Sequence, residues 1–180
     1  MTIALTPPPS RSAFEGLEEP TLVARYRHGP NHFSNTLLNI PDDLLDTYWR
    51  PEAEVGRWSI RALLGHLADC EIVFAHRLRR IVAEDNPTVG AFDENAFIDS
   101  GLYNGAAHPI AGFLAAIVTT RNWCGQWLST LEEDAFSRTA LHTETGPITF
   151  KGTLSYTTWH LEHHAYYLRL KLEKIDTPSE

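Results

Sequence analysis

The sequence predicts an all-α protein, a four-helix bundle with a short β-hairpin before its last helix. Apolar residues recur at helical spacing in several long stretches of the chain. Most links between these stretches are short, as in bundles. The chain has 180 residues, of which 43% are hydrophobic and 21% are charged. This length and composition suit a single soluble domain with a substantial core.

The N-terminal part of the chain is expected to divide into an arm and the start of the bundle. Three consecutive prolines at positions 7–9 prevent a continuous helix there. We therefore expect residues 1–20 to form an extended arm and residues 21–176 to form one bundle domain. Helical patterning begins near Leu22, and Pro41 marks a point where a new helical turn can start.

Two long helices are expected in the middle of the chain. Ser59 is a good N-cap for the first of them, which runs until the Asn86–Pro87 pair ends it. Pro109 opens the second helix. Residues 90–108 form a long link rich in aromatic and acidic side chains. Links of that length in small domains are more often functional than passive.

The last part of the chain combines a hairpin with a helix. β-Prone residues flank Thr145, Gly146 and Pro147, which predicts a short hairpin within residues 139–151. The last helix is expected to start at Gly152. Its apolar stripe comprises Leu154, Leu161, Leu168, Leu172 and Ile175.

Charge and composition exclude several classes of partner and location. The net charge of −8 argues against nucleic acid, which requires clustered Lys and Arg. The densest basic group, Arg77, Arg79 and Arg80, is expected to be a solvated helix face. Two cysteines are too few for a disulfide framework. The sequence lacks a signal peptide and an apolar run of about 20 residues, so we expect a cytoplasmic protein without membrane contact.

Histidines carry the strongest functional signal. Three of the nine histidines lie within the string His160–His164. Residues i and i+4 of a helix are neighbours on one face, so His160 and His164 can bind one metal ion. His163 lies about 60° to the other side of His160 and is a poorer ligand. His66 sits at the edge of an apolar helix face and is the best third ligand.

Alternatives to a metal centre remain open at this point. A lone histidine such as His66 is more often a hydrogen-bonded core residue, and a helical HxxxH pair is often surface decoration. The HExxH motif of zinc peptidases needs Glu where Leu161 stands. Its inverted form needs Glu where His163 stands. A metallopeptidase is therefore disfavoured.

Several segments together resemble the DinB/YfiT-like family of metal-dependent enzymes, over roughly residues 30–175. The segments are LDTYWRP at 45–51, RWSIR at 57–61, GHLAD at 65–69, DNP at 85–87 and WHLEHH at 159–164. The resemblance implies a four-helix bundle with a three-histidine metal centre, often a homodimer. The family's ligands fall on His66, His160 and His164. Members include thiol-dependent S-transferases, maleylpyruvate isomerases, and many proteins named hydrolases without a demonstrated reaction.

Three neutral ligands would leave a metal ion with open positions, as in catalytic sites. Such an ion can lower the pKa of bound water to about 7 or hold a thiol as thiolate. The sequence therefore predicts a metal-dependent hydrolase or a thiol-dependent S-transferase acting on a small molecule. The metal is expected to be zinc or nickel, with iron or manganese also suited, and a low-molecular-weight thiol is a candidate cosubstrate.

Residues around the centre carry further expectations. Asp69, one turn after His66, is the candidate catalytic acid–base residue. Cys70 is expected to be a buried thiol, and Glu162 to face solvent. Trp58, Phe92, Tyr103 and Trp159 are candidates for a substrate cleft, with ordinary core packing as the alternative.

Two rival functions make different structural predictions. A non-catalytic, stress-related bundle that binds metal or another ligand predicts a fourth protein ligand or a blocked cavity. A dimerisation module without metal predicts that His66 lies far from the His160–His164 pair.

Overall fold

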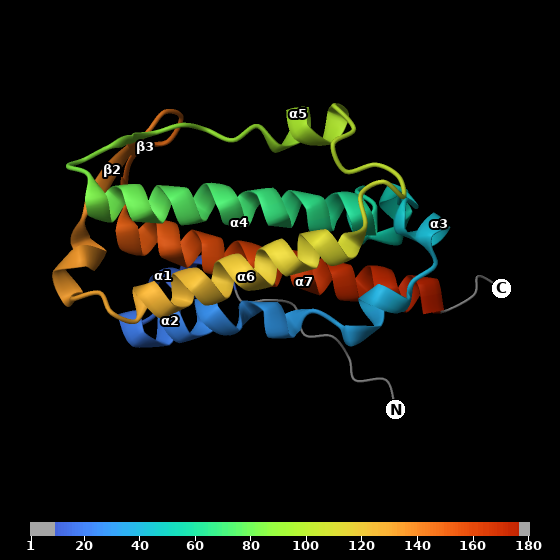
Figure 1. Ribbon diagram of the computed structural model, residues 1–180, viewed down its shortest axis with the longest axis horizontal. Helices are drawn as coiled ribbons and strands as arrows, with labels where there is room; N and C mark the ends of the chain where they lie inside the picture. Colours follow the sequence, from blue (N-terminus) through green and yellow to red (C-terminus); the bar gives the residue numbers. More distant parts are fainter. Residues whose placement is uncertain (1–9, 177–180) are drawn as a thin grey trace.

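The computed structural model describes residues 10–176. Four long helices, α2, α4, α6 and α7, lie side by side along the longest axis of the molecule (Figure 1). The elements are α1 (Arg11–Glu15), α2 (Glu19–His28), η1 (Gly29–His32), η2 (Asn35–Asn39), α3 (Asp42–Leu45), η3 (Pro51–Ala53), α4 (Ile60–Ala83), β1 (Thr88–Val89), α5 (Glu94–Asp99), α6 (Ile110–Leu128), η4 (Glu133–Ser137), β2 (Thr139–His142), β3 (Gly146–Thr149) and α7 (Phe150–Asp176). The predicted bundle with a hairpin before the last helix is confirmed.

Local sequence signals set the ends of the long helices. The Ser59 hydroxyl accepts a hydrogen bond from the Ala62 amide at 3.1 Å and caps α4, as expected. Pro109 immediately precedes α6. The last helix begins at Phe150, two residues before the predicted start at Gly152. The Thr149 hydroxyl accepts a hydrogen bond from the Gly152 amide at 3.0 Å and caps this helix.

A three-stranded sheet covers one end of the bundle. Strands β2 and β3 form the predicted antiparallel hairpin. The two-residue strand β1, which follows α4, pairs in parallel with β2. We did not predict β1, because two residues are too few to show an alternating pattern.

The prediction of an extended arm over residues 1–20 is wrong for its described part. Residues 11–15 form α1, and α2 begins at Glu19. Phe14 is completely buried, and the Ser155 hydroxyl of α7 donates to its carbonyl at 3.3 Å. Burial of this ring fixes the segment against the bundle. The prolines at 7–9 lie outside the described residues.

The core forms along both halves of the bundle. Near the sheet, α2, α4, α6 and α7 contribute to one buried cluster that includes Tyr26, Leu78 and Leu154. A second cluster, with Leu64, Ile117 and Leu168, fills the other half. None of the helices described is long and apolar enough to span a membrane. Histidines of α4 and α7 lie where these two halves meet.

Candidate metal centre

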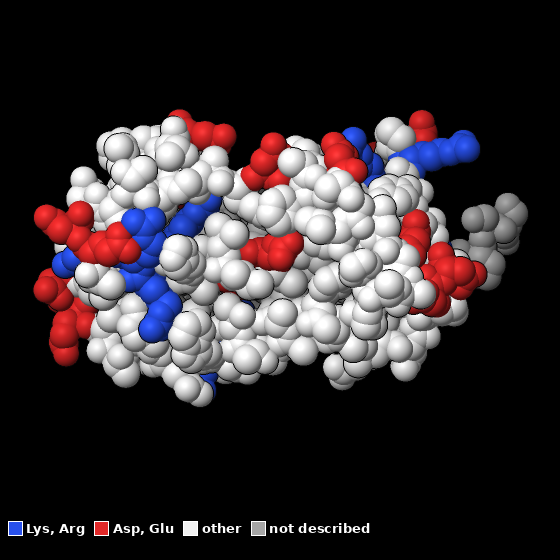
Figure 2. Space-filling view, turned by 45° about the horizontal axis from the view of Figure 1, so that its top comes forward, with Lys and Arg blue, Asp and Glu red and all other residues white. Residues whose placement is uncertain are grey.

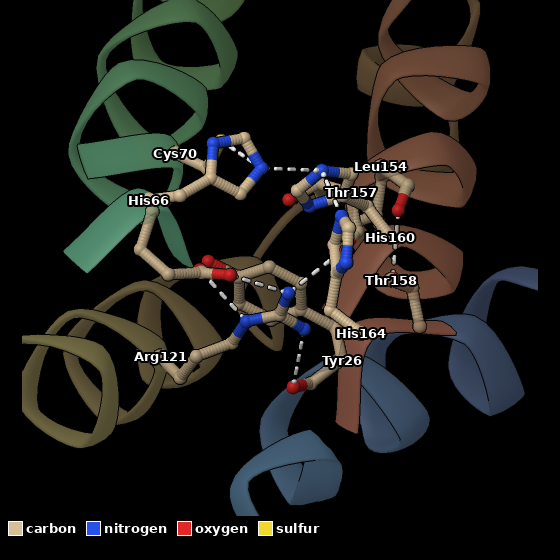
Figure 3. A network of polar contacts seen from close by, with 10 residues as sticks. Tyr26, His66, Cys70, Arg121, Leu154, Thr157, Thr158, His160 and His164 are labelled. Carbon is tan, nitrogen blue, oxygen red and sulfur yellow. Dashed lines mark hydrogen bonds and ion pairs between the residues drawn. The ribbon is translucent and has the colours of Figure 1, made fainter. Parts of the chain in front are cut away.

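The three predicted ligands come together between α4 and α7. The Nε2 atom of His160 lies 3.3 Å from Nε2 of His66 and 3.2 Å from Nε2 of His164. The ligand atoms of the three residues are all within 4.8 Å of one another. Figure 3 shows the His66 ring, from α4, meeting the two rings of α7. The remote position of His66 that a dimerisation module without metal predicts is therefore not observed.

The spacing of these nitrogens fits a shared metal ion. Two nitrogens bound to one tetrahedral zinc at about 2.0–2.1 Å lie roughly 3.3–3.4 Å apart. The two closest nitrogen pairs match this separation. Nε2 of His160 is close to two other ring nitrogens, and each of these contacts can hold only one hydrogen. Hydrogen bonds alone therefore do not satisfy all three nitrogens well. A cation bound by all three lone pairs satisfies them.

Burial keeps the three imidazoles neutral. It lowers the pKa of His66 to about 4. Burial, followed by the neighbouring rings, lowers the pKa of His164 to about 3 and that of His160 well below its usual value. Neutral imidazole is the form that binds metal. Nδ1 of His160 is buried without a hydrogen-bond partner among the described residues. No hydrogen bond at Nδ1 fixes the orientation of this ring, and a metal bound at Nε2 would fix it.

Aromatic rings surround the histidines. The Trp58 ring lies 4.9 Å from that of His66, and the Phe92 ring stacks on His66 at 6.4 Å. Phe74 meets the edge of His160 at 5.8 Å. Phe92 belongs to the long link before α6. The link therefore places an apolar side chain over the cluster, as its composition indicated.

A buried ion pair lies beside the histidines, and its hydrogen bonds join four helices. Arg121 of α6 makes a two-nitrogen contact with the Glu71 carboxylate of α4, at 2.7 and 2.6 Å. It also donates to the carbonyls of Tyr26 and Thr157. Both charged side chains are fully buried. Figure 3 shows Arg121 beside Tyr26 and close to the histidines. Glu71 and Thr157 lie close in sequence to the histidines of their helices, so this network sets the position of α4 relative to α7.

An open cavity of about 760 Å³ reaches all three histidines. It runs between α4 and α7 toward the hairpin, and its walls include three of the four candidate cleft residues, Trp58, Phe92 and Trp159. Tyr103 does not line it; this ring packs on Gly65, where an added Cβ would lie 2.3 Å from it. For Tyr103, the alternative of core packing is correct.

Asp69 lies beside the cluster rather than in the cavity. Its carboxylate accepts a hydrogen bond from the Tyr103 hydroxyl at 2.5 Å. Asp69 is not among the residues that line the cavity. Burial, followed by this hydrogen bond, raises the pKa of Tyr103, so the phenol keeps its proton. Asp69 thereby ties the long link to α4, one turn from His66.

Three further residues lie close to the cluster without belonging to it. The Cys70 thiol is buried, as expected, and its sulfur lies 3.6 Å from Nε2 of His66, although it is not part of the group of converging ligand atoms. His163 also lies outside that group but lines the cavity. The expectation that Glu162 faces solvent is wrong. Its carboxylate is buried and binds Arg25 at 2.7 and 2.8 Å, because α2 covers that face of α7.

A second, smaller cavity reaches the cluster from another side. It has a volume of about 360 Å³ and shares Trp58, His163 and His164 with the larger one. Arg57 and Lys171 also line it.

Sequence reasoning missed two functional features of this region. The Arg121–Glu71 pair gave no local signal, since its members are 50 residues apart. Arg77, expected on a solvated face, instead lines the larger cavity. Arg77 lies eleven residues after His66, which is about three helical turns, so the two side chains share one face of α4. This spacing could have identified Arg77 from the sequence.

Comparisons with known proteins agree with this architecture. A relative from Oceanobacillus iheyensis named "Putative metal-dependent hydrolase" is 29% identical over 148 residues, 82% of this chain and 81% of the relative. "Putative metal-dependent hydrolase YfiT" from Bacillus subtilis is 30% identical over 131 residues, 71% of this chain and 68% of the relative.

The solved structure of B. subtilis YfiT, described as a probable metal-dependent hydrolase with an unusual four-helix bundle topology, matches with a TM-score of 0.77. The match covers 88% of this chain and 87% of that one at 23% identity, and it shows the fold alone. A family model described as the DinB superfamily matches residues 10–168. This stretch contains all three histidines of the cluster, and the chain therefore belongs to the DinB superfamily.

Proposed function

We propose that this protein is an enzyme that binds one divalent transition metal through His66, His160 and His164 and hydrolyses a small molecule. One observation carries the proposal: three buried, neutral imidazoles converge at the wall of an open cavity. No fourth His, Cys, Asp or Glu of the described residues joins the group. This arrangement favours an enzyme over the non-catalytic bundle, which requires a fourth ligand or a blocked cavity.

When bound, the metal would supply Lewis acidity, with zinc and nickel as the best-suited ions. The side chains of the chain have complementary tasks. Trp58 and Phe92, which lie against the His66 ring, would help to exclude water from it. His163 lines the cavity beside the ligands and can exchange a proton with a substrate. A direct catalytic role for Asp69 stays a prediction, and its hydrogen bond to Tyr103 supports a positioning role.

A thiol-dependent S-transferase is the second candidate. The smaller cavity supports it, because a transfer reaction needs places for two substrates and this cavity also reaches His164. Arg57, which is exposed at this cavity, would favour an anionic low-molecular-weight thiol there. The homodimer and the cytoplasmic location stay predictions of the sequence.

Metal analysis tests the proposal. Protein purified without chelator is compared with a His160→Ala/His164→Ala variant by elemental analysis. His142→Ala serves as a control, because His142 lines the same cavity outside the group. We expect about one metal per chain in the wild type and the control, and none in the double variant. Ester hydrolysis and thiol transfer are then assayed on the loaded protein. Failure of the wild type to bind zinc, nickel, iron or manganese would contradict the proposal.

A further inference from the structure

The larger cavity has two chemically different ends. Its histidine end lies at His66, and its other end lies near the hairpin, where Arg77 and Thr149 contribute. His66 and Arg77 are eleven residues apart on α4, which puts them on one face and about 16 Å apart along the helix axis. Between these ends, the walls are largely aromatic. The residues there are Phe74, Phe92, Tyr156 and Trp159.

Among the carboxylates of the described residues, only Glu144 stabilises the charge of Arg77, and it does so from a distance rather than in a direct ion pair. Its guanidinium donates to the Gly90 carbonyl at 2.5 Å and lies 5.5 Å from the centre of the Phe74 ring. None of the ion pairs among the described residues involves Arg77. Arg80, one turn along the same helix, is paired with Glu84 at 2.6 Å. A guanidinium has five N–H donors, so most of those of Arg77 remain for a ligand.

Partial removal from water destabilises the charged Arg77 guanidinium unless an anion binds to it. Arg77 is half-buried, and burial lowers its pKa. A charged group removed from water is stabilised by a partner of opposite charge. Figure 2 shows Lys and Arg side chains intermixed with Asp and Glu side chains at the end of the molecule where α4 ends and the hairpin begins, so the attraction for an anion comes from Arg77 itself and not from a basic surface.

Other charges in the cavity limit the kind of anion. Glu94 and Glu144 line it as well. They disfavour ligands with several negative charges, such as nucleotides. Arg11 lines the cavity too, but its side chain is 56% exposed and pairs with Glu15 at 3.3 Å. Arg77 is therefore the residue best placed to bind a single carboxylate.

We propose that the cavity binds an elongated monocarboxylate, with its carboxylate on Arg77 and its aromatic or aliphatic body directed along α4 and α7 toward the three histidines. The inference deepens the proposed function and depends on it only in treating the histidine end as the reactive end. A planar guanidinium suits a carboxylate because it can donate two parallel hydrogen bonds.

Ligand binding without metal tests this inference. The probes are 6-phenylhexanoate and its uncharged amide, 6-phenylhexanamide, and binding to chelator-treated protein is followed by the fluorescence of the cavity tryptophans or by calorimetry. We expect the wild type to bind the acid about tenfold more tightly than the amide, as for a charge-assisted hydrogen bond. Arg77→Gln should abolish this preference without weakening the amide, and Arg77→Lys should keep part of it.

Arg79→Gln is the matched control, because Arg79 lies over Trp123 on another face of α4. It should bind both probes as the wild type does. A preference that survives Arg77→Gln, an equal loss in Arg79→Gln, or no preference in the wild type at millimolar probe would overturn the inference. Metal content is measured separately, so failure to bind metal with an intact Arg77-dependent preference would refute only the proposed function.

Discussion

Lys171 shows how burial affects a charged side chain at the far end of α7. Its side chain is only 1% exposed, and its ammonium donates to the carbonyls of Val55 and Gly56. Burial lowers its pKa to about 8. The carbonyls hold the charged form in place, while desolvation works against it.

This shift predicts that stability rises with pH. The folded-state pKa of Lys171 lies below the unfolded value of about 10.4. Between about pH 8 and 10.4 the unfolded chain therefore binds more protons, and the free energy of unfolding increases with pH, by about 3 kcal/mol at most. Urea denaturation across this window should show the rise in the wild type relative to Lys171→Met. Parallel pH profiles would contradict it.

Asp69 and Tyr103 join two elements, α4 and the long link that holds Phe92 over the cluster. If Asp69 acts through Tyr103, Tyr103→Phe and Asp69→Ala should lower kcat/KM by similar factors, and the double variant should be no worse than either. A catalytic acid–base role predicts instead a loss of about 10²–10⁴-fold in Asp69→Ala alone, with an altered pH profile. Metal content should stay unchanged in all three variants.

The Arg121–Glu71 pair positions α4, α6 and α7. Arg121→Met would leave the Glu71 carboxylate buried without a partner and should cost about 3–5 kcal/mol in urea denaturation. The Arg121→Met/Glu71→Met variant should recover part of this loss. Arg80→Met is the control, since its exposed pair with Glu84 contributes less than about 1 kcal/mol. Equal losses of unfolding free energy in Arg121→Met and Arg80→Met would show that the buried pair contributes no more than the exposed one.

At the scale of the whole molecule, metal binding should stabilise the bundle, because the ligands come from two helices. A metal that binds only the folded chain raises the free energy of unfolding by about 2.7 kcal/mol at a metal concentration 100 times its Kd. Chelator should remove this gain, and the His160→Ala/His164→Ala variant should show none. The measurement is urea denaturation with and without zinc. An equal zinc effect in the variant would point to binding elsewhere.

Much of the fold could be predicted from local patterns. Ser59 and Pro109 mark helix starts by backbone chemistry that acts within a few residues, and both predictions are confirmed. The turn residues around Gly146 likewise predicted the hairpin. Phe14 and Phe150 show the limit of such patterns. Phe14 is buried where α1 packs on α7, and the Phe150 ring contacts Phe136, so both depend on contacts that no short sequence window contains.

The sequence by itself determined the bundle, the hairpin and the His160–His164 pair, because helical and strand periodicities and the i,i+4 spacing are properties of local chain geometry. Only the tertiary structure decided that His66 meets this pair, that Asp69 binds Tyr103, and that Arg77 enters the cavity. These contacts depend on how α4, α7 and the long link pack together. The burial of side chains across all four helices sets that packing, and no single segment encodes it.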